Sequence, residues 1–546
     1  MHAWMKSHGF GRLARAAAAI LVVLLVGATF RAGVQKGLVG TIGLQEWGRY
    51  LFGIGAALTQ SRWGIGGYVI DSPIEQKLQV EGLTDNPDKL KALGLSFPDN
   101  FRDESVMQRA LEQARAFDVA PAPHDDFRRL RGSGGDDIGI APFTTLAFWL
   151  FGSKISALYY TYFVLLCATI FLCVLGHWRS PAAMACLALM VLSLYLLVTS
   201  DLVNFTRELA PHRGEAGSDV KDPRFFGTIA AFPALHLLLT WLRRDHQLAP
   251  FDVIVLFGQA VVLAFVIQIR WPVLWLLFAL YAYWIVRLAS FPKLSLRELC
   301  HWRQAQSLPV AAVYALVISG GVVLVNITAH PIYRLDGDLL HHPLWQNAIE
   351  SLEANPDWDL RYLSTVNGIR SDEMPREIAR QEIAKLPPDQ RSQYLTRGGW
   401  PSPAAASYFA RARFFQILWT DPLFVLHTFL VDQPKMILSM LSQFYLDLVR
   451  SVSLLQGFGV FATVGMIVWI GAADPQAPVL LRPLVGVAGG FSLIALLPSF
   501  IAALPHQLTM IDHFLWFLLF LCLLICFGGV CLARGLAILS PWHRPF

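Results

Sequence analysis

The amino-acid sequence predicts an all-α polytopic membrane protein, and the composition, the apolar runs and the charge distribution all indicate this class. The 546 residues are 55% hydrophobic and only 15% charged, which is too apolar for several ordinary soluble domains. The apolar residues gather in runs long enough to cross a hydrocarbon core of about 30 Å as helices. The net charge of +5 is small and no run of basic residues exists, so we expect no nucleic-acid partner.

The apolar runs predict ten transmembrane helices. Basic residues flank the start of the first run and no small-residue cleavage site follows it, so we interpret this run as a retained helix rather than a signal peptide. The predicted spans are residues 14–31, 155–176, 181–199, 225–241, 251–269, 271–287, 309–327, 454–471, 480–504 and 513–533.

Charged residues predict the orientation of these spans. Threading the chain alternately through the membrane places thirteen basic and only three acidic residues on the side of the N-terminus. Because basic residues favour the cytoplasmic side, both termini are predicted to be cytoplasmic. All seven cysteines lie in predicted spans or in the cytoplasmic loop that contains Cys300, which leaves no disulfide framework outside. The alanine-rich spans favour a bacterial inner membrane as the location.

The predicted spans divide the chain into five parts, because two polar stretches between spans are too long to be simple connectors. The parts are 1–31, the N-terminal tail and first span; 32–154, a first extracytoplasmic loop with surface helices; 155–327, spans two to seven; 328–453, a second large extracytoplasmic segment; and 454–546, the last three spans and a cytoplasmic tail.

The first extracytoplasmic loop contains a predicted surface helix with an acidic start. Residues 101–117 place apolar side chains at helical spacing, with Asp103 and Glu104 in the first turn. Helix capping is one explanation for this pair, because the free amides of a first turn favour carboxylates. A catalytic or binding role at the membrane surface is the other.

A second acidic pair, Asp136 and Asp137, precedes the apolar residues 138–152. A helix of this length reaches about 22 Å, which is too short to span a bilayer comfortably. A span here would also invert every later loop and remove the charge asymmetry. We therefore predict an interfacial or re-entrant helix, with two carboxylates near the membrane surface or simply solvated in the loop.

This order of features resembles the GT-C superfamily of glycosyltransferases that use lipid-phosphate sugars, including the protein mannosyltransferase and aminoarabinose transferase group. An Asp-Glu pair opens a surface helix, and an apolar stretch ending in Leu150–Gly152 precedes the next span. The resemblance covers residues 101–176, and the overall topology adds to it. It implies that Asp103, assisted by Glu104, is the catalytic base. The rival is Asp71, which lies nearer to the first span.

The reaction that the resemblance implies needs a base for the acceptor hydroxyl and a group that stabilises the leaving phosphate. The donor is a polyprenyl-phosphate-linked sugar whose tail stays in the membrane lipid, and the acceptor is an envelope glycan, lipid or protein. The site is therefore expected at the outer membrane surface. Further candidates are Asp137, Asp201, Arg270 and His341 for the donor phosphate or the acceptor, and Asp336 and Asp338 for a metal.

These further candidates come from three later outer loops. Asp201 ends a span where the superfamily often has a second acidic residue. Arg270 lies in a short turn between two spans, where it can meet the donor phosphate or reach lipid head groups. Asp336, Asp338 and His341 follow the seventh span closely, and an Asp-x-Asp pair can bind Mg²⁺ or Mn²⁺. Solvated loops, and ordinary turn chemistry at Asp-Gly-Asp, are the alternatives.

The later part of the second large outer segment predicts a small extramembrane subdomain followed by surface helices. Residues 345–400 mix helix and turn sequences, and we expect them to contact the acceptor. Residues 404–450 alternate apolar and charged side chains without a long apolar run, which favours amphipathic helices on the membrane surface. If residues 422–446 span the membrane instead, the C-terminus changes sides.

Three other functions fit ten membrane spans: a transporter of lipid-linked glycans, a polysaccharide polymerase or ligase, and a non-catalytic scaffold. The middles of the spans contain almost no ionisable residue apart from His236, whereas ion-coupled carriers usually need some. No paired broken helices are visible either. The early surface helix with its acidic pair favours the glycosyltransferase over the polymerase or ligase.

Overall fold

The computed structural model describes residues 8–35, 139–151, 156–200, 225–242, 247–289, 300–301, 308–328, 344–370, 373–395, 399, 401–451, 454–502 and 511–539. These residues form helices and short connections. An isolated β bridge joins Leu395 and Pro401, and no strand forms among these residues. The described part of the chain is therefore all-α, as the composition predicts.

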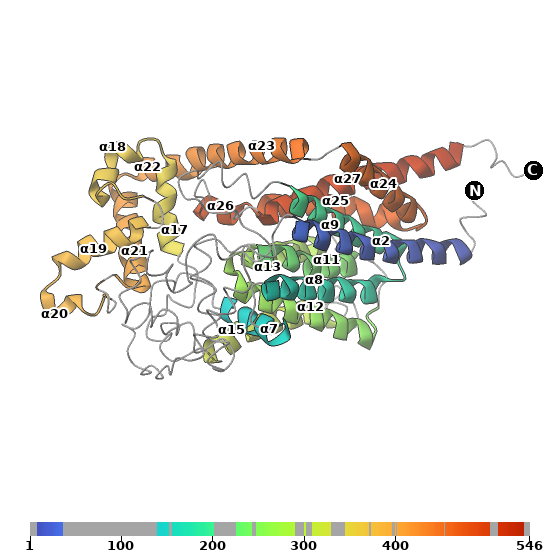
Figure 1. Ribbon diagram of the computed structural model, residues 1–546, viewed down its shortest axis with the longest axis horizontal. Coiled ribbons are helices and arrows are strands. Elements are labelled where there is room, and N and C mark those ends of the chain that lie inside the picture. Colours follow the sequence, from blue (N-terminus) through green and yellow to red (C-terminus); the bar gives the residue numbers. More distant parts are fainter. Residues whose placement is uncertain are drawn as a thin grey trace, which may run out of the picture.

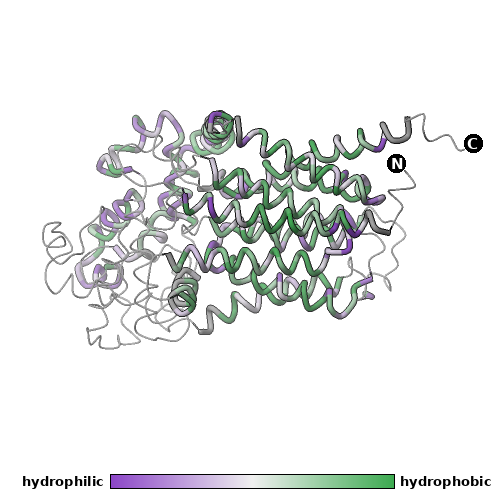
Figure 2. The backbone as a smooth tube through the Cα atoms, turned by 45° about the vertical axis from the view of Figure 1, so that its right-hand side comes forward, coloured by the Kyte–Doolittle hydropathy of each residue, from purple (hydrophilic) through white to green (hydrophobic). Residues whose placement is uncertain are grey.

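Most helices form a bundle whose members run roughly along the long axis of the molecule (Figure 1). Hydrophobic residues dominate these helices, whereas the helices at one end of the molecule are much more hydrophilic (Figure 2). The bundle contains α2 (His8–Gln35), α7 (Ile140–Phe151), α8 (Ser156–His177), α9 (Pro181–Thr199), α11 (Phe226–Leu242), α12 (Pro250–Ile269), the 3-10 turn η4 (Trp271–Leu274), α13 (Trp275–Ala289), α15 (Leu308–Thr328), α24 (Leu454–Ala472), α25 (Ala477–Ile494), α26 (Leu497–Ala502) and α27 (Ile511–Leu539).

Seven of the described helices are long and apolar enough to cross a membrane, so the protein is a polytopic membrane protein of the all-α class. Three more apolar helices are shorter, and together the ten coincide with the ten predicted spans. The exact number of spans stays a prediction. The seven are Gly11–Gln35, Ala157–His177, Pro181–Thr199, Pro250–Ile269, Trp271–Ala289, Ala477–Phe500 and Ile511–Gly535, and the shorter three are Phe226–Leu242, Leu308–Leu324 and Gln456–Ala472.

The central helix of the bundle is α9, whose side chains are almost all buried. Its small residues, including Ala182, Ala185 and Ala188, let neighbouring helices approach closely, and α2, α24 and α27 pack around it. Ser180 caps its first turn by accepting a hydrogen bond from the Ala183 amide at 3.3 Å. An alanine-rich span thus becomes the core of the bundle because its short side chains leave room for the other helices.

Contacts at one end of the bundle join segments that the predicted topology places on one side of the membrane. We call this the termini end, because the described chain begins and ends there (Figure 1). The Arg15 guanidinium lies 5.4 Å from the centre of the Trp178 ring. The Asp474 carboxylate accepts hydrogen bonds from Ser180 Oγ at 3.0 Å and from the Ala182 amide at 3.1 Å. Arg534 donates to the carbonyl of Pro475 at 3.1 Å. The cytoplasmic location of this end stays a prediction from the charge distribution.

Asp474 is buried, so these contacts are expected to contribute measurably to stability. Replacing Asp474 by alanine leaves the Ala182 amide, in the first turn of α9, without its acceptor and should lower the free energy of unfolding by about 2 kcal/mol. The unfolding midpoint of the detergent-solubilised protein measures this loss. Gln476→Ala, at an exposed position two residues away, is the matched control. Equal midpoints for the two variants would contradict the anchoring role of Asp474.

The opposite end of the bundle carries the hydrophilic helices, and we call it the subdomain end (Figure 1). The subdomain is built around buried Trp358, whose ring lies 5.3 Å from Tyr362 and 6.4 Å from Phe424. Its elements are α17 (Leu344–Glu350), η6 (Ser351–Ala354), α18 (Trp358–Arg361), η7 (Leu363–Val366), α19 (Met374–Lys385), α20 (Pro388–Arg391), α21 (Pro403–Thr420) and α22 (Pro422–His427).

The subdomain leads back to the bundle through one long helical run. It consists of α22, a π-helical turn η9 (Thr428–Asp432) and α23 (Gln433–Ser451), and it lies along the edge of the bundle towards α24 (Figure 1). The run is apolar and long enough to cross a membrane only together with the preceding helix Ala405–Thr420, and the two helices are bent by 105°. The residues are helical as predicted, and their position on the membrane surface rather than across it stays a prediction.

The short apolar helix α7 has both of its ends at the subdomain end. The Gly139 amide, just before its start, donates to the Gln268 carbonyl at the end of α12 at 2.9 Å. At the other end, Phe151 lies 5.6 Å from Tyr160 in the first turns of α8. A helix that returns to the end from which it came does not cross the bundle, which agrees with the interfacial position predicted from its length.

Candidate functional site

Of the residues predicted to form the functional site, the structure describes Arg270. The carboxylates of the first loop and the cluster after the seventh span lie outside the described residues, so their proposed roles stay predictions. These residues are Asp71, Asp103, Glu104, Asp136, Asp137, Asp201, Asp336, Asp338 and His341. Among the described residues, no group of three His, Cys, Asp or Glu side chains is arranged to hold a metal ion.

Arg270 lies at the subdomain end, in the turn where the sequence placed it. Its amide closes α12 by donating to the Val266 carbonyl at 2.9 Å, and its own carbonyl accepts from the Val273 amide of η4 at 3.1 Å. Its backbone is extended, with φ −143° and ψ 90°, so the chain turns sharply between α12 and α13. The guanidinium therefore lies at the carbonyl end of a helix, where the helix dipole favours a positive charge.

A described carboxylate within electrostatic range of this arginine belongs to Asp512, in the first turn of α27. Asp512 is 9% exposed, and its Oδ2 accepts a hydrogen bond from Trp275 Nε1 at 2.7 Å. Its Oδ1 is buried and has no hydrogen-bond partner among the described residues. Arg270 lies close enough to interact electrostatically with Asp512. A buried carboxylate with one unpaired oxygen is unusual and marks this position for a functional role.

Gly227 supplies the space that Asp512 occupies. A Cβ atom at this position would overlap the Asp512 carboxyl group, so α11 can approach α27 only with glycine there. A similar close approach occurs at Gly139, where a Cβ atom would overlap the backbone of Gln268 and Ile269. The subdomain end is thus closely packed around the Asp512 carboxylate by residues from α11, α13 and α27, with α7 packed nearby against α12.

The next residue, His513, faces the other way and joins α27 to α23. Its Nδ1 donates to the Ser492 carbonyl at 2.6 Å, which leaves Nε2 to accept a hydrogen bond from the Tyr445 hydroxyl at 3.0 Å. Phe444 stacks on Phe514, with ring centres 3.5 Å apart. The first turn of α27 therefore connects the bundle, through Asp512, with the helix that leads from the subdomain, through His513.

A third polar group lies inside the bundle, around His236. The side-chain amide of Gln259 donates to the Thr169 carbonyl at 2.9 Å and lies 3.2 Å from His236 Nδ1, which makes that nitrogen an acceptor. His177 Nε2 lies 3.3 Å from the His236 carbonyl, and the two imidazole rings are 4.7 Å apart. These contacts connect α8, α11 and α12 and place two imidazoles inside the bundle.

Sequence reasoning missed the hydrogen bond between Asp512 and Trp275. The two residues are 237 positions apart, and no local pattern connects them. The usable signal was weaker: an acidic residue opening a very apolar helix, at the same predicted membrane side as Arg270. Chemically, the pair of opposite charges offers a carboxylate and a guanidinium at one end of a membrane bundle.

The comparisons with known proteins add no relative: no family model, no curated protein and no solved structure matches this chain. The class of protein that the fold defines is therefore a polytopic membrane protein with an all-α bundle and a helical subdomain at one end.

Proposed function

We propose that the protein is a glycosyltransferase of the GT-C type that moves a sugar from a polyprenyl-phosphate donor to an envelope glycan, lipid or protein acceptor. The observation that carries this proposal is the buried Asp512 carboxylate, which Trp275 holds at the subdomain end within electrostatic range of Arg270. An arginine is suited to bind the phosphate of the donor, and a carboxylate near it fixes the guanidinium in place. The lipid tail of such a donor would remain beside the apolar bundle while its head group reacts at the bundle end.

The position of the subdomain also supports the proposal. It stands at the same end as Arg270 and Asp512, so an acceptor bound by the subdomain would lie on the side where the donor phosphate arrives (Figure 1). The first outer loop leads into α7 at this end, because Gly139 contacts Gln268 there. Residues from widely separated parts of the chain can therefore contribute to one reaction at the membrane surface.

The roles of the individual residues in this proposal follow the resemblance to the superfamily. Asp103 is the base with Glu104 beside it, and Asp71 is its rival. Asp137, Asp201, Arg270 and His341 would bind the donor phosphate or the acceptor, and Asp336 and Asp338 would hold Mg²⁺ or Mn²⁺. The bacterial inner membrane, with both termini cytoplasmic, remains the proposed location.

A transporter of lipid-linked glycans is the second candidate, and the buried histidines His177 and His236 are the observation that favours it. The two functions differ in whether they need a sealed membrane. A glycosyltransferase works in detergent solution, whereas transport is defined only between two compartments. Sugar transfer by the purified, detergent-solubilised protein would support the first function and oppose the second.

The test of the catalytic assignment is sugar transfer from a radiolabelled polyprenyl-phosphate donor to acceptors in isolated envelope. Because a general base typically contributes a factor of about 10² to 10⁴, Asp103→Asn should lower the rate by about a hundredfold or more. Asp252→Asn, in the first turn of α12 at the termini end of the bundle, is the matched control and should leave the rate unchanged. Full activity in the Asp103, Asp71 and Asp136 variants alike would show that the site has been assigned wrongly.

A further inference from the structure

The helical run from α22 to α23 exposes large apolar side chains on both sides of its π turn. Leu423, Leu426 and Leu430 are 78%, 51% and 71% exposed. Beyond the turn, Leu438, Leu446 and Val449 are 64%, 56% and 74% exposed. The described protein therefore leaves an apolar surface about as long as the run itself, and we call these six residues the leucine stripe.

The π turn keeps the leucine stripe on one face of the helix. An α-helix turns about 100° per residue, so without the π turn Leu438, Leu446 and Val449 would face about 120° away from the first three leucines. The turn Thr428–Asp432 inserts one residue into the helix, which rotates everything after it back by about 100°. The two halves of the stripe then point in nearly the same direction.

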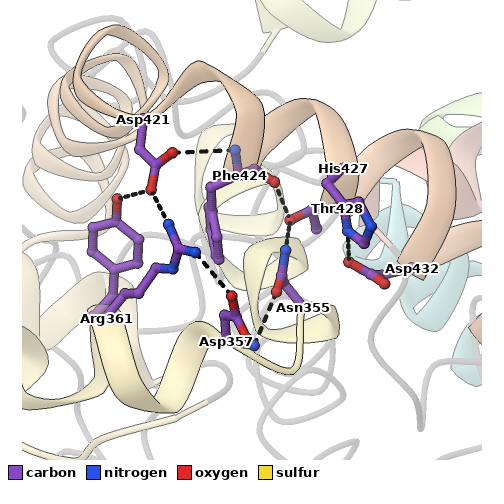
Figure 3. Close-up of polar contacts among 9 residues, drawn as sticks. Asn355, Asp357, Arg361, Asp421, Phe424, His427, Thr428 and Asp432 are labelled. Atoms are coloured by element: carbon purple, nitrogen blue, oxygen red, sulfur yellow. Dashed lines mark hydrogen bonds and ion pairs between the residues drawn. The ribbon is translucent and has the colours of Figure 1, made fainter.

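Side chains hold this π turn in place. His427 Nδ1 lies 2.8 Å from Asp432 Oδ2, and these residues are five positions apart, the spacing at which a π turn brings side chains together (Figure 3). The side-chain Nδ2 of Asn355 donates to Thr428 Oγ1 at 3.0 Å, and that hydroxyl donates to the Phe424 carbonyl at 2.8 Å (Figure 3). The subdomain thus binds the π turn through the hydrogen bond to Thr428.

The contacts of the opposite face leave the leucine stripe uncovered. Gln433 Nε2 donates to the Ser351 carbonyl of the subdomain at 3.3 Å. Phe444 and Tyr445 pack on α27, where Tyr445 bonds to His513. Arg361 joins Asp357 and Asp421 at 2.9 and 2.7 Å, and these hydrogen bonds raise the pKa of Arg361 (Figure 3). The buried side of the run is thus fixed to the protein between Asp421 and Tyr445.

The exposed side of the run is divided into an apolar and a polar flank. On a helix with the π turn, exposed His427, Ser439 and Arg450 fall to one side of the middle of the leucine stripe, whereas exposed Lys435 and Ser442 lie close to that middle. A helix with leucines on one flank and cationic or hydroxyl side chains on the other fits the boundary between acyl chains and head groups. The charges suit anionic phosphate groups of lipids.

The leucine stripe continues into the apolar surface of the bundle. Only two residues separate α23 from the apolar helix α24, whose Phe458 and Phe461 are 72% and 77% exposed. At the other end of the run, Trp419 is 80% exposed, and tryptophan is common at membrane interfaces. A surface that is continuous with membrane-spanning helices and bordered by tryptophan shares their apolar environment.

We propose that the leucine stripe of α22–α23 is seated in the lipid leaflet at the subdomain end, with the π turn as the device that keeps it in register. The bilayer then positions the subdomain, and the Tyr445–His513 hydrogen bond connects this helix with the turn that carries Asp512. The inference does not depend on the reaction that the protein catalyses.

Photo-crosslinking tests this inference. A benzophenone amino acid is placed at position 430 or 438 of the full chain, reconstituted in vesicles of phosphatidylethanolamine and phosphatidylglycerol. Because both positions lie on the leucine stripe, on and beyond the π turn, both should yield acyl-chain adducts in the mass spectrum. Position 439, which is adjacent and exposed but on the polar flank, is the matched control and should yield severalfold fewer lipid adducts.

The products also identify any other occupant. Adducts at 438 with a second copy of the chain, or no excess of lipid adducts over position 439, would overturn the proposal. Lipid adducts at 430 without adducts at 438 would overturn the role of the π turn. The unfolding midpoint of each labelled protein, compared with that of the unlabelled chain, verifies that the exposed label leaves the fold intact.

Discussion

Replacing Gly227 by valine is expected to disrupt the subdomain end of the bundle and to abolish the sugar transfer that we propose. A Cβ atom at this position overlaps the Asp512 carboxyl group, and the added branches leave no room for the Trp275–Asp512 hydrogen bond. Overpacking of this kind costs about 1–3 kcal/mol in a well-packed core. The unfolding midpoint and the transfer rate in detergent measure the two effects separately.

A second substitution distinguishes loss of fold from loss of function. Gly227→Val combined with Asp512→Ala removes the overlapping carboxyl group and should recover part of the lost midpoint, because the two sites are in direct contact. Transfer should remain absent in the double variant if the carboxylate positions Arg270. Gly320→Val is the steric control, because nothing lies within 4 Å of a Cβ atom there. Recovered transfer in the double variant would remove Asp512 from the proposed site.

Replacing Trp358 by alanine is expected to unfold the subdomain while the bundle stays folded. Its side chain is 1% exposed and packs between Tyr362 and Phe424, and the loss of a buried tryptophan typically costs about 3–5 kcal/mol. Limited proteolysis should then cut within residues 344–432 and leave the apolar helices protected. Trp419→Ala is the matched control, because that side chain is 80% exposed and outside the core of the subdomain. Identical cleavage of both variants would show that Trp358 does not hold the subdomain together.

The membrane bundle could be predicted from sequence because each span carries its own signal. Apolar runs such as α8, α9 and α27 need no partner to be recognised, since the bilayer requires about 20 apolar residues of any spanning helix. The turn at Arg270 was also found locally, as a polar interruption between two runs. Threading the spans alternately through the membrane then places Ser180 and Asp474 on the same side, and the structure brings these two residues into contact.

The arrangement at the subdomain end was not predictable, because it depends on contacts between residues that are far apart in the sequence. Asp512 meets Trp275 only because α13 and α27 pack in one particular way, and Gly227 permits that packing by lacking a side chain. The π turn likewise depends on contacts between Thr428 and Asn355, which come from separate elements. Of the predicted site, the structure places Arg270, and the roles of the carboxylates in the outer loops continue to rest on the sequence.

The distance along the chain between Trp275 and Asp512 determines when the subdomain end can be completed during biosynthesis. Asp512 belongs to the last described helix, so Trp275 enters the bilayer long before the ribosome has made the residue that accepts its hydrogen bond. Until α27 is inserted, the indole nitrogen and the neighbouring Arg270 must be satisfied by water, lipid or the translocation machinery. The packing around Asp512 is thus completed only at the end of translation, and a nascent chain that stalls before α27 lacks it.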